Sequence, residues 1–222
     1  KLCFWAALFR SYPRLTRFRR LRFVRKQIFL TVIYILKQGL LTLMNLEILS
    51  RKPKAGASRS KPKIVFVHGI CVDAWTWDEF FLPYFADHGY EAYALSLRGH
   101  GKSGGKSNIL TWSLVDYASD LEQVVSSLDG PVIVVGHSLG GAVVQEWLRT
   151  GASRDRAVGA ALLASVPPWG LAYSGVRMAT INPQLYRELG VMIMFGAESV
   201  DEKVMRRALF SKDAPEVIFD KF

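Results

Sequence analysis

Residues 134–142, Val-Val-Gly-His-Ser-Leu-Gly-Gly-Ala, decide the fold of this 222-residue chain. The apolar run 132–135 before Gly136 predicts a buried strand, and apolar residues at 143, 144, 147 and 148 predict a helix. Between them, Gly136-x-Ser138-x-Gly140 predicts a tight turn that lifts the Ser138 hydroxyl out of the sheet, at the positive end of the helix. A Cβ at Gly136 or Gly140 would collide with the neighbouring strand or helix backbone, so both positions require glycine.

Further strands and helices alternate around this motif. The apolar run Ile64–Val67 is followed by His68-Gly69-Ile70, and a second predicted strand, 90–97, is followed by Arg-Gly-His-Gly-Lys-Ser at 98–103. A helix is predicted between them at 77–88, and another apolar strand at 158–165. The alternation predicts an α/β fold with a mostly parallel sheet and helices on both faces.

The order of these motifs resembles the α/β-hydrolase superfamily, and most closely its serine esterase and lipase members. All the matching motifs fall within residues 62–170. The resemblance implies that Ser138 is the nucleophile and that the backbone N–H groups of Leu139 and Ile70 form the oxyanion hole. It implies supporting roles in the motifs for His68, Gly69, Gly136, His137 and Gly140. It implies no metal and no cofactor.

The implied function is a serine hydrolase that cleaves a carboxylic ester, with lipid-like esters among the candidate substrates, through an acyl-enzyme on Ser138. Members of the family carry an acid and then a histidine after the nucleophile. Residues 139–222 contain no histidine, because the four histidines are His68, His88, His100 and His137. We therefore expect a C-terminally truncated chain that is inactive as given. The alternative is a non-catalytic member of the fold that binds a small apolar ligand or a protein partner.

Two other glycine patterns suggest nucleotide binding, and both fail. Gly99-x-Gly101-x-x-Gly104 matches a dinucleotide fingerprint as a string, but the next helix is predicted to begin only near Thr111. A pyrophosphate would then have no helix N-terminus to receive it. Gly105-Lys106-Ser107 resembles the end of a phosphate-binding loop, but residue 100, where that loop needs its first glycine, is a histidine.

Charge is distributed unevenly along the chain. Residues 1–63 contain 16 of the 29 Lys and Arg residues but only one of the 19 Asp and Glu residues. The part that carries the motifs is therefore mildly acidic, and nothing in it indicates nucleic-acid binding. Cys3 and Cys71 are too few and too poorly placed for a disulfide framework or a metal site.

The N-terminal 50 residues are predicted to form a basic and apolar helical extension. Arginines crowd residues 10–26, and Ile28–Leu49 is mostly apolar but is interrupted by Lys37. A spanning helix needs about 20 nearly uninterrupted apolar residues. A membrane span, a helix lying on anionic lipid, a targeting peptide and a helix packed on the domain all stay open. We expect a membrane-associated or organelle-targeted protein.

These observations divide the chain into four segments. We predict the extension at 1–50, a solvated linker at 51–62, an incomplete hydrolase core at 63–166 and the start of a lid at 167–222. The lid prediction rests on the break at Pro167-Pro168-Trp169-Gly170 and on the apolar, helical character of the residues that follow. Methionine and aromatic side chains there would suit an apolar acyl chain or form the buried faces of the lid helices.

Overall fold

The fold is that of a computed structural model, which describes residues 44–54, 61–196 and 199–211. The chain separates into two compact units, residues 1–43 and residues 44–222. The first unit lies outside the described residues. Membrane association or targeting through residues 1–50 therefore stays a prediction. Among the described residues, no helix is both long enough and apolar enough to cross a membrane.

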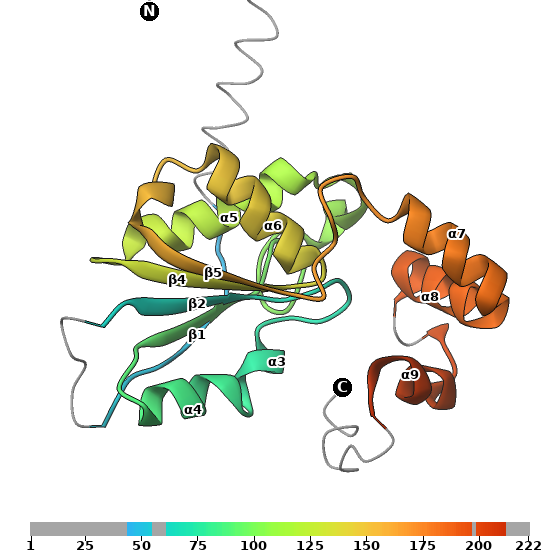
Figure 1. Cartoon of the computed structure of the whole chain (residues 1–222), viewed down its shortest axis with the longest axis horizontal. Coiled ribbons are helices and arrows are strands. Elements are labelled where there is room, and N and C mark those ends of the chain that lie inside the picture. The colour runs from blue at the N-terminus through green and yellow to red at the C-terminus, as the bar shows by residue number, and fades with distance from the viewer. Residues whose placement is uncertain (1–43, 55–60, 197–198, 212–222) are drawn as a thin grey trace, which may run out of the picture. The chain divides into compact units, whose positions relative to one another are not determined.

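A five-stranded sheet forms the centre of the second unit (Figure 1). Its order is β1-β3-β2-β4-β5, with β1 antiparallel to β3 and all other neighbours parallel. All four strands predicted from the sequence are present, and the mostly parallel α/β sheet is confirmed. The strands are β1 (Ile48–Arg51), β2 (Lys63–Val67), β3 (Ala92–Leu95), β4 (Val132–His137) and β5 (Ala157–Leu163).

Strand β1 is not predicted by the sequence analysis. It pairs with β3 in the register Ile48↔Leu95, and the Ser96 N–H donates to the Glu47 carbonyl at 2.9 Å. The predicted boundary between the extension and the linker, at residue 50, falls inside this strand, so residues 48–51 belong to the sheet instead. The strand has four residues at the sheet edge and is mostly exposed, so backbone pairing defines it and no apolar pattern marks it.

Helices cover both faces of the sheet, as predicted (Figure 1). On one face lie α5 (Leu114–Ser127) and α6 (Leu139–Thr150). On the other lie α3 (Trp75–Asp78) and α4 (Phe81–Asp87). Two short 3₁₀ helices, Lys106–Thr111 and Arg154–Arg156, lie in the connections. Helix α5 begins with a capping box in which the side chain of Ser113 and that of Asp116 each bond the other's backbone N–H.

The single helix predicted at 77–88 is wrong, because the structure divides it into α3 and α4. A continuous helix would need the residue-83 N–H to bond the carbonyl of residue 79, and Pro83 has no N–H. Proline is tolerated in the first turn of a helix, where Pro83 lies in α4.

Two apolar cores pack on the two faces of the sheet. The larger lies against α5 and α6 and includes Trp147, which is fully buried and donates its indole N–H to the Glu122 carboxylate at 2.7 Å. The smaller lies against α3 and α4, where the Phe66 ring packs on the Trp77 ring at a centroid distance of 4.9 Å. The sheet is therefore fixed from both sides, and its strand ends form a rigid platform for loops.

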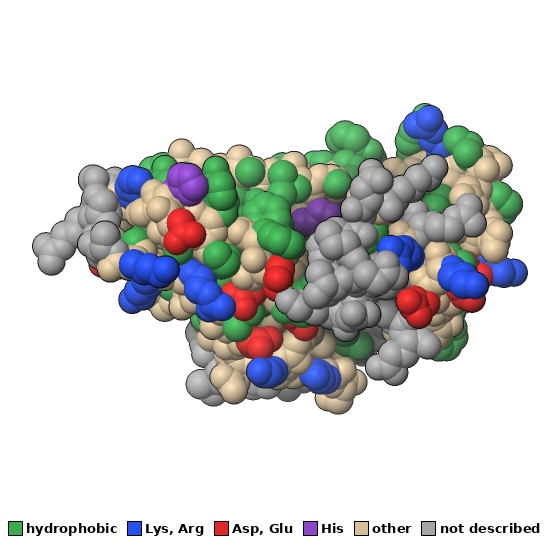
Figure 2. Space-filling view, turned by 90° about the horizontal axis from the view of Figure 1, so that it is seen from below, with side chains coloured by type: hydrophobic (Ala, Val, Ile, Leu, Met, Phe, Trp, Pro, Cys, Tyr) green, Lys and Arg blue, Asp and Glu red, His purple; other side chains and the backbone are tan. Residues whose placement is uncertain are grey.

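Apolar side chains are exposed at several places among the described residues of the second unit, including the α4 region, strand β5 and the segment after β5. Figure 2, seen from the side of α3 and α4, shows hydrophobic side chains on that face, and Phe80, Phe81 and Tyr84 of the α4 region are exposed. Strand β5 is the edge strand opposite β1, and Val158 is 64% exposed. Beyond β5 the described residues include three helices, α7 (Ala172–Ile181), α8 (Pro183–Phe195) and α9 (Glu202–Leu209).

Candidate active site

Ser138 lies in the turn between β4 and α6. Strand β4 ends at His137 and α6 begins at Leu139, so a single residue makes the whole connection. Its backbone has φ 52° and ψ −114°, a conformation that is uncommon for a residue with a side chain. The turn places Ser138 at the N-terminus of α6, where the partial positive charge of the helix favours an anion.

The glycines flanking Ser138 are required by close backbone approaches, as predicted. A Cβ on Gly136 would lie 2.4 Å from the Gly140 carbonyl oxygen. A Cβ on Gly140 would lie 2.3 Å from the carbonyl oxygen of Val67, at the end of β2. Both contacts are with backbone atoms, which cannot move aside. The glycines thus let the first turn of α6 pack directly on the ends of β2 and β4.

The loop after β2 lies against Ser138. A Cβ on Gly69 would lie 3.2 Å from the Ser138 Cβ and 3.1 Å from Nδ1 of His137. Ile70 follows immediately. Within the described part of the chain, the backbone N–H groups of Ile70 and Leu139 donate no hydrogen bond, and the Ser138 hydroxyl makes none. Two candidate oxyanion donors and the candidate nucleophile thus remain available to a ligand.

His68 is a buried structural residue that joins two loops. Its Nδ1 lies 2.7 Å from the Gly69 carbonyl, and its Nε2 accepts the Leu97 N–H at 2.9 Å. Because Nε2 accepts, the ring is neutral and the proton is on Nδ1, which donates to Gly69. Burial lowers the pKa of His68 to about 3. The ring therefore fixes the loop after β2 to the end of β3 and is unsuited to carrying a proton in a reaction.

The buried ring predicts a specific pH dependence of stability. An unfolded histidine takes up a proton near pH 6.5, whereas folded His68 does so only near its pKa of about 3. The stability it contributes is complete above about pH 6.5 and is lost as the pH falls through about 3. We expect wild type to lose up to about 1.4 kcal/mol per pH unit more than His68→Gln across this window. Urea unfolding at a series of pH values measures this, and parallel profiles for the two proteins would contradict it.

The other histidines do not complete a serine site. His88 is at the C-terminal end of α4, with Nδ1 2.7 Å from the Tyr84 carbonyl. His100 is buried with Nδ1 3.1 Å from the Arg98 carbonyl, and its pKa is lowered by burial. His137 precedes the serine in the same turn, and partial burial lowers its pKa. None of the four histidines forms a hydrogen bond with Ser138 in the described structure.

Comparison with known proteins identifies the family. The model for the alpha/beta hydrolase family matches residues 64–221, which include every strand after β1, the Ser138 turn and the C-terminal helices. The chain belongs to the alpha/beta hydrolase family. The predicted fold class, with its mostly parallel sheet and helices on both faces, is confirmed by this match and by the observed topology.

Individual members of the alpha/beta hydrolase family match only part of the chain. A non-heme chloroperoxidase of Streptomyces lividans is 35% identical over 106 residues, which is 47% of this chain and 37% of that protein. Salicylic acid-binding protein 2 of Nicotiana tabacum is 39% identical over 79 residues, which is 35% of this chain and 30% of that protein. The matched region thus spans about a third of the length of these curated relatives.

The similarity to solved structures concerns the fold. An esterase from Exiguobacterium antarcticum superimposes with a TM-score of 0.58 at 17% identity, covering 81% of this chain and 62% of that chain. The chain is therefore partial in length relative to its relatives, as expected from the sequence.

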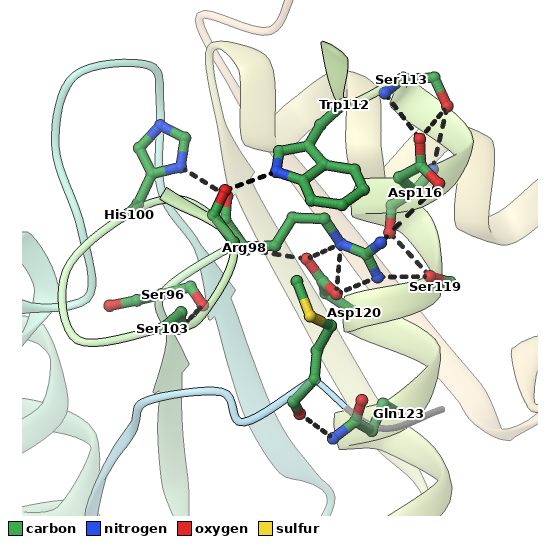
Figure 3. Close-up of polar contacts among 12 residues, drawn as sticks. Ser96, Arg98, His100, Ser103, Trp112, Ser113, Asp116, Ser119, Asp120 and Gln123 are labelled. Carbon is green, nitrogen blue, oxygen red and sulfur yellow. Dashed lines mark hydrogen bonds and ion pairs between the residues drawn. The ribbon is translucent and has the colours of Figure 1, made fainter. Parts of the chain in front are cut away.

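A buried network of hydrogen bonds and ion pairs around Arg98 fixes the loop that follows β3 (Figure 3). The fully buried Arg98 side chain donates from Nε and Nη2 to the Asp120 carboxylate on α5, at 2.6–3.0 Å, and from Nη2 to Ser119 Oγ at 2.9 Å. A second carboxylate, on Asp116, lies 3.7 Å from Nη1, and the guanidinium lies over the Trp112 ring at 5.1 Å. Burial raises the pKa of Asp120, and the hydrogen bonds from Arg98 oppose that shift. The network is structural and anchors residues 98–105 to α5.

Two polar residues beside the Ser138 turn, Gln145 and Ser165, are not among the residues predicted from the sequence. Gln145 on α6 and Ser165 after β5 meet beside the turn, with Gln145 Nε2 2.8 Å from Ser165 Oγ. A Cβ on Gly141 would lie 2.3 Å from the same Ser165 Oγ, so this glycine makes room for Ser165. Gly141 was the signal in the sequence that could have indicated this contact. The Gly136-x-Ser138-x-Gly140 pattern requires Gly140 but not Gly141, so a glycine at 141 indicates another close neighbour.

A polar hollow elsewhere is separate from the candidate site. It lies at the edge of the sheet where β2 and β4 begin, whereas Ser138 and Gly69 follow the ends of those strands. Its lining residues are Lys52, Lys61, Lys63, Glu91, Tyr93 and 127–131.

Proposed function

We propose that the protein cleaves small carboxylic esters through an acyl-enzyme on Ser138. The observation that carries the proposal is the geometry of the turn. Ser138 has a strained backbone at φ 52°, it immediately precedes α6, and its hydroxyl has no hydrogen-bond partner among the described residues. Strain of this kind persists where the surrounding structure enforces it, and it concentrates at functional sites.

In the proposed reaction, Ser138 Oγ attacks the ester carbonyl carbon and the carbonyl oxygen becomes negatively charged. The N–H groups of Leu139 and Ile70 would donate to that oxygen, because both are free and both lie in the segments that meet at Ser138. Loss of one such donor typically costs about 2.7–4 kcal/mol of transition-state stabilisation. Both are backbone groups, so their positions depend on the Gly69 loop and on the α6 turn rather than on their side chains.

The reaction also requires a general base for the Ser138 proton. None of the four histidines of this chain is placed to accept the Ser138 proton. This absence is also the observation that favours the second candidate function, a non-catalytic member of the family that binds a small apolar ligand or a protein partner at the same turn.

The helices after β5 support an apolar substrate. We propose that α7 and α8, in the predicted lid segment 167–222, belong to a lid over the candidate site, because α8 contacts Cys71, which follows Ile70. The Cys71 Sγ lies 3.8 Å from the Met192 carbonyl, and Met192, at 4% exposure, is the only buried residue of α7 and α8. Apolar side chains on these helices would favour an aliphatic acyl group, so lipid-like esters fall within the proposed substrate class.

The full-length protein tests this proposal directly. We expect hydrolysis of p-nitrophenyl esters across a series of acyl chain lengths, and a covalent fluorophosphonate adduct on the peptide that contains Ser138. The substitution Ser126→Ala, on the exposed side of α5, provides a control that keeps the adduct.

Three outcomes would contradict the proposal. An adduct confined to another serine would remove Ser138 as the nucleophile. Saturable binding of an apolar ligand without turnover or adduct would favour the non-catalytic function. Peroxide-dependent chlorination without ester hydrolysis would favour an activity like the one for which the Streptomyces relative is named.

A further inference from the structure

The backbone of Ser138 is held by the segment that follows β5. The Ser138 N–H donates to the Leu163 carbonyl at 3.0 Å, and the Val166 N–H donates to the Ser138 carbonyl at 3.0 Å. Between these two contacts, Ala164 has φ 44°, in the left-handed region that residues with a Cβ rarely occupy. Ser138 and Ala164 are thus both strained, and the two backbone hydrogen bonds join Ser138 to Leu163 and Val166, the residues that flank the Ala164-Ser165 pair.

One side chain of α6 secures this segment. Gln145 lies two helical turns after Ser138, on the same face of the helix. Its Nε2 lies 2.8 Å from Ser165 Oγ, 3.0 Å from the Val166 carbonyl and 3.2 Å from the Gly141 carbonyl. Ser165 Oγ in turn donates to the Val166 carbonyl at 3.0 Å. The Gln145 amide thus joins the first turn of α6 to the segment 163–166, which is hydrogen-bonded to the Ser138 backbone.

We propose that Gln145 is a positioning residue for the nucleophile, acting through Ser165 and Val166 on the backbone of Ser138. The inference rests on the proposed function, since it assumes that Ser138 attacks the substrate. Without the amide donor, the carbonyl of Val166 loses a partner and the segment 164–166 relaxes toward less strained backbone angles. The Val166 N–H then no longer fixes the Ser138 carbonyl, and Oγ is free to leave its attacking position. A displacement of about 1 Å can reduce a rate about 100-fold.

The first test measures the reactivity of Ser138 in the full-length protein. We expect Gln145→Leu to reduce both kcat and the rate of fluorophosphonate labelling by about 10- to 100-fold, with little change in KM. Thr150→Ala is the matched control, because it also removes a side-chain hydrogen bond to a backbone carbonyl of α6, but at the far end of the helix. We expect Thr150→Ala to leave both rates within about twofold of wild type.

A second variant separates positioning from folding. In Gln145→Glu, an ionised carboxylate would face the carbonyls of Gly141 and Val166, both acceptors, whereas the protonated acid can donate to one of them. We therefore expect the labelling rate, divided by that of wild type at the same pH, to rise several-fold as the pH decreases from about 8 to about 5. The corresponding ratio for Gln145→Leu should stay constant, because leucine does not titrate.

The outcomes distinguish failure of the inference from failure of the proposed function. If wild type is neither labelled at Ser138 nor active on esters, the proposed function is wrong. If wild type is labelled and Gln145→Leu is labelled at the same rate, the positioning role of Gln145 is wrong. A flat pH ratio for Gln145→Glu would also overturn it, because packing alone would then explain the loss.

Discussion

The substitution Ser138→Ala is expected to reduce ester turnover by the full-length protein on the order of 10⁶-fold while leaving the fold intact. Without Oγ no acyl-enzyme can form, and only binding and the oxyanion donors remain to accelerate attack by water. The stability of the protein should change little. The Ser138 hydroxyl has no hydrogen-bond partner among the described residues, and alanine meets the same backbone strain at φ 52°.

The measurement is kcat/KM for an activated ester, together with the melting temperature of each protein. Ser126→Ala serves as the control, because it removes the same atom from an exposed serine whose Oγ donates to the Gln123 carbonyl on α5. A Ser138→Ala protein that retains turnover within tenfold of wild type would show that another group attacks the ester. A collapsed melting temperature would show instead that the hydroxyl has a structural role.

The second large effect concerns stability. We expect Asp120→Ala to lower the free energy of unfolding at pH 7 by about 3–5 kcal/mol. Arg98 is fully buried, and Asp120 accepts its strongest hydrogen bonds, so the substitution leaves a guanidinium whose nearest carboxylate is Asp116, 3.7 Å from Nη1. The Arg98 N–H also loses its acceptor, because it donates to Asp120 at 2.9 Å. Urea unfolding followed by circular dichroism measures the difference.

Two further variants establish that the effect comes from an uncompensated buried charge. Asp155→Ala removes an exposed carboxylate that lies 3.8 Å from Arg154, and we expect a cost below about 1 kcal/mol. The double substitution Arg98→Met with Asp120→Leu removes both charges and should recover much of the stability lost in Asp120→Ala. If Asp120→Ala costs no more than Asp155→Ala, the network in Figure 3 does not stabilise the fold.

The sequence predicted the parts of the site that depend on local geometry. A glycine on either side of Ser138, after a β-branched strand and before an apolar helix, is enough to predict the turn. The backbone that excludes a Cβ at Gly136 lies in the same motif, whereas the backbone that excludes one at Gly140 belongs to Val67 at the end of β2. The supporting role of His68 was implied by the resemblance to the α/β-hydrolase family and not by local geometry. Burial at 0% exposure, with both ring nitrogens occupied, agrees with that interpretation.

The features that the sequence did not predict depend on contacts between residues that are distant in the chain. Strand β1 exists because its backbone pairs with β3, which lies more than 40 residues later, and its own four side chains carry little pattern. The partnership of Gln145 with Ser165 joins a helix to a loop 20 residues away. Likewise, Asp120 is an ordinary acidic residue of an amphipathic helix until folding brings Arg98 to it. Such pairs become visible only when the topology is known.

Strand β5 has a practical consequence for every measurement on this chain. Its seven residues, Ala-Val-Gly-Ala-Ala-Leu-Leu, carry no charge, whereas the opposite edge strand β1 ends in Arg51. An uncharged edge strand can pair with a strand of another molecule. Natural proteins commonly prevent this with lysine or proline on the edge strand, or with a helix or loop that covers it. Self-association through β5 joins two molecules, so the associated fraction would increase with protein concentration. The apparent melting temperature would then depend on protein concentration by mass action. A dilution series is therefore needed with every melting curve and activity assay on this chain.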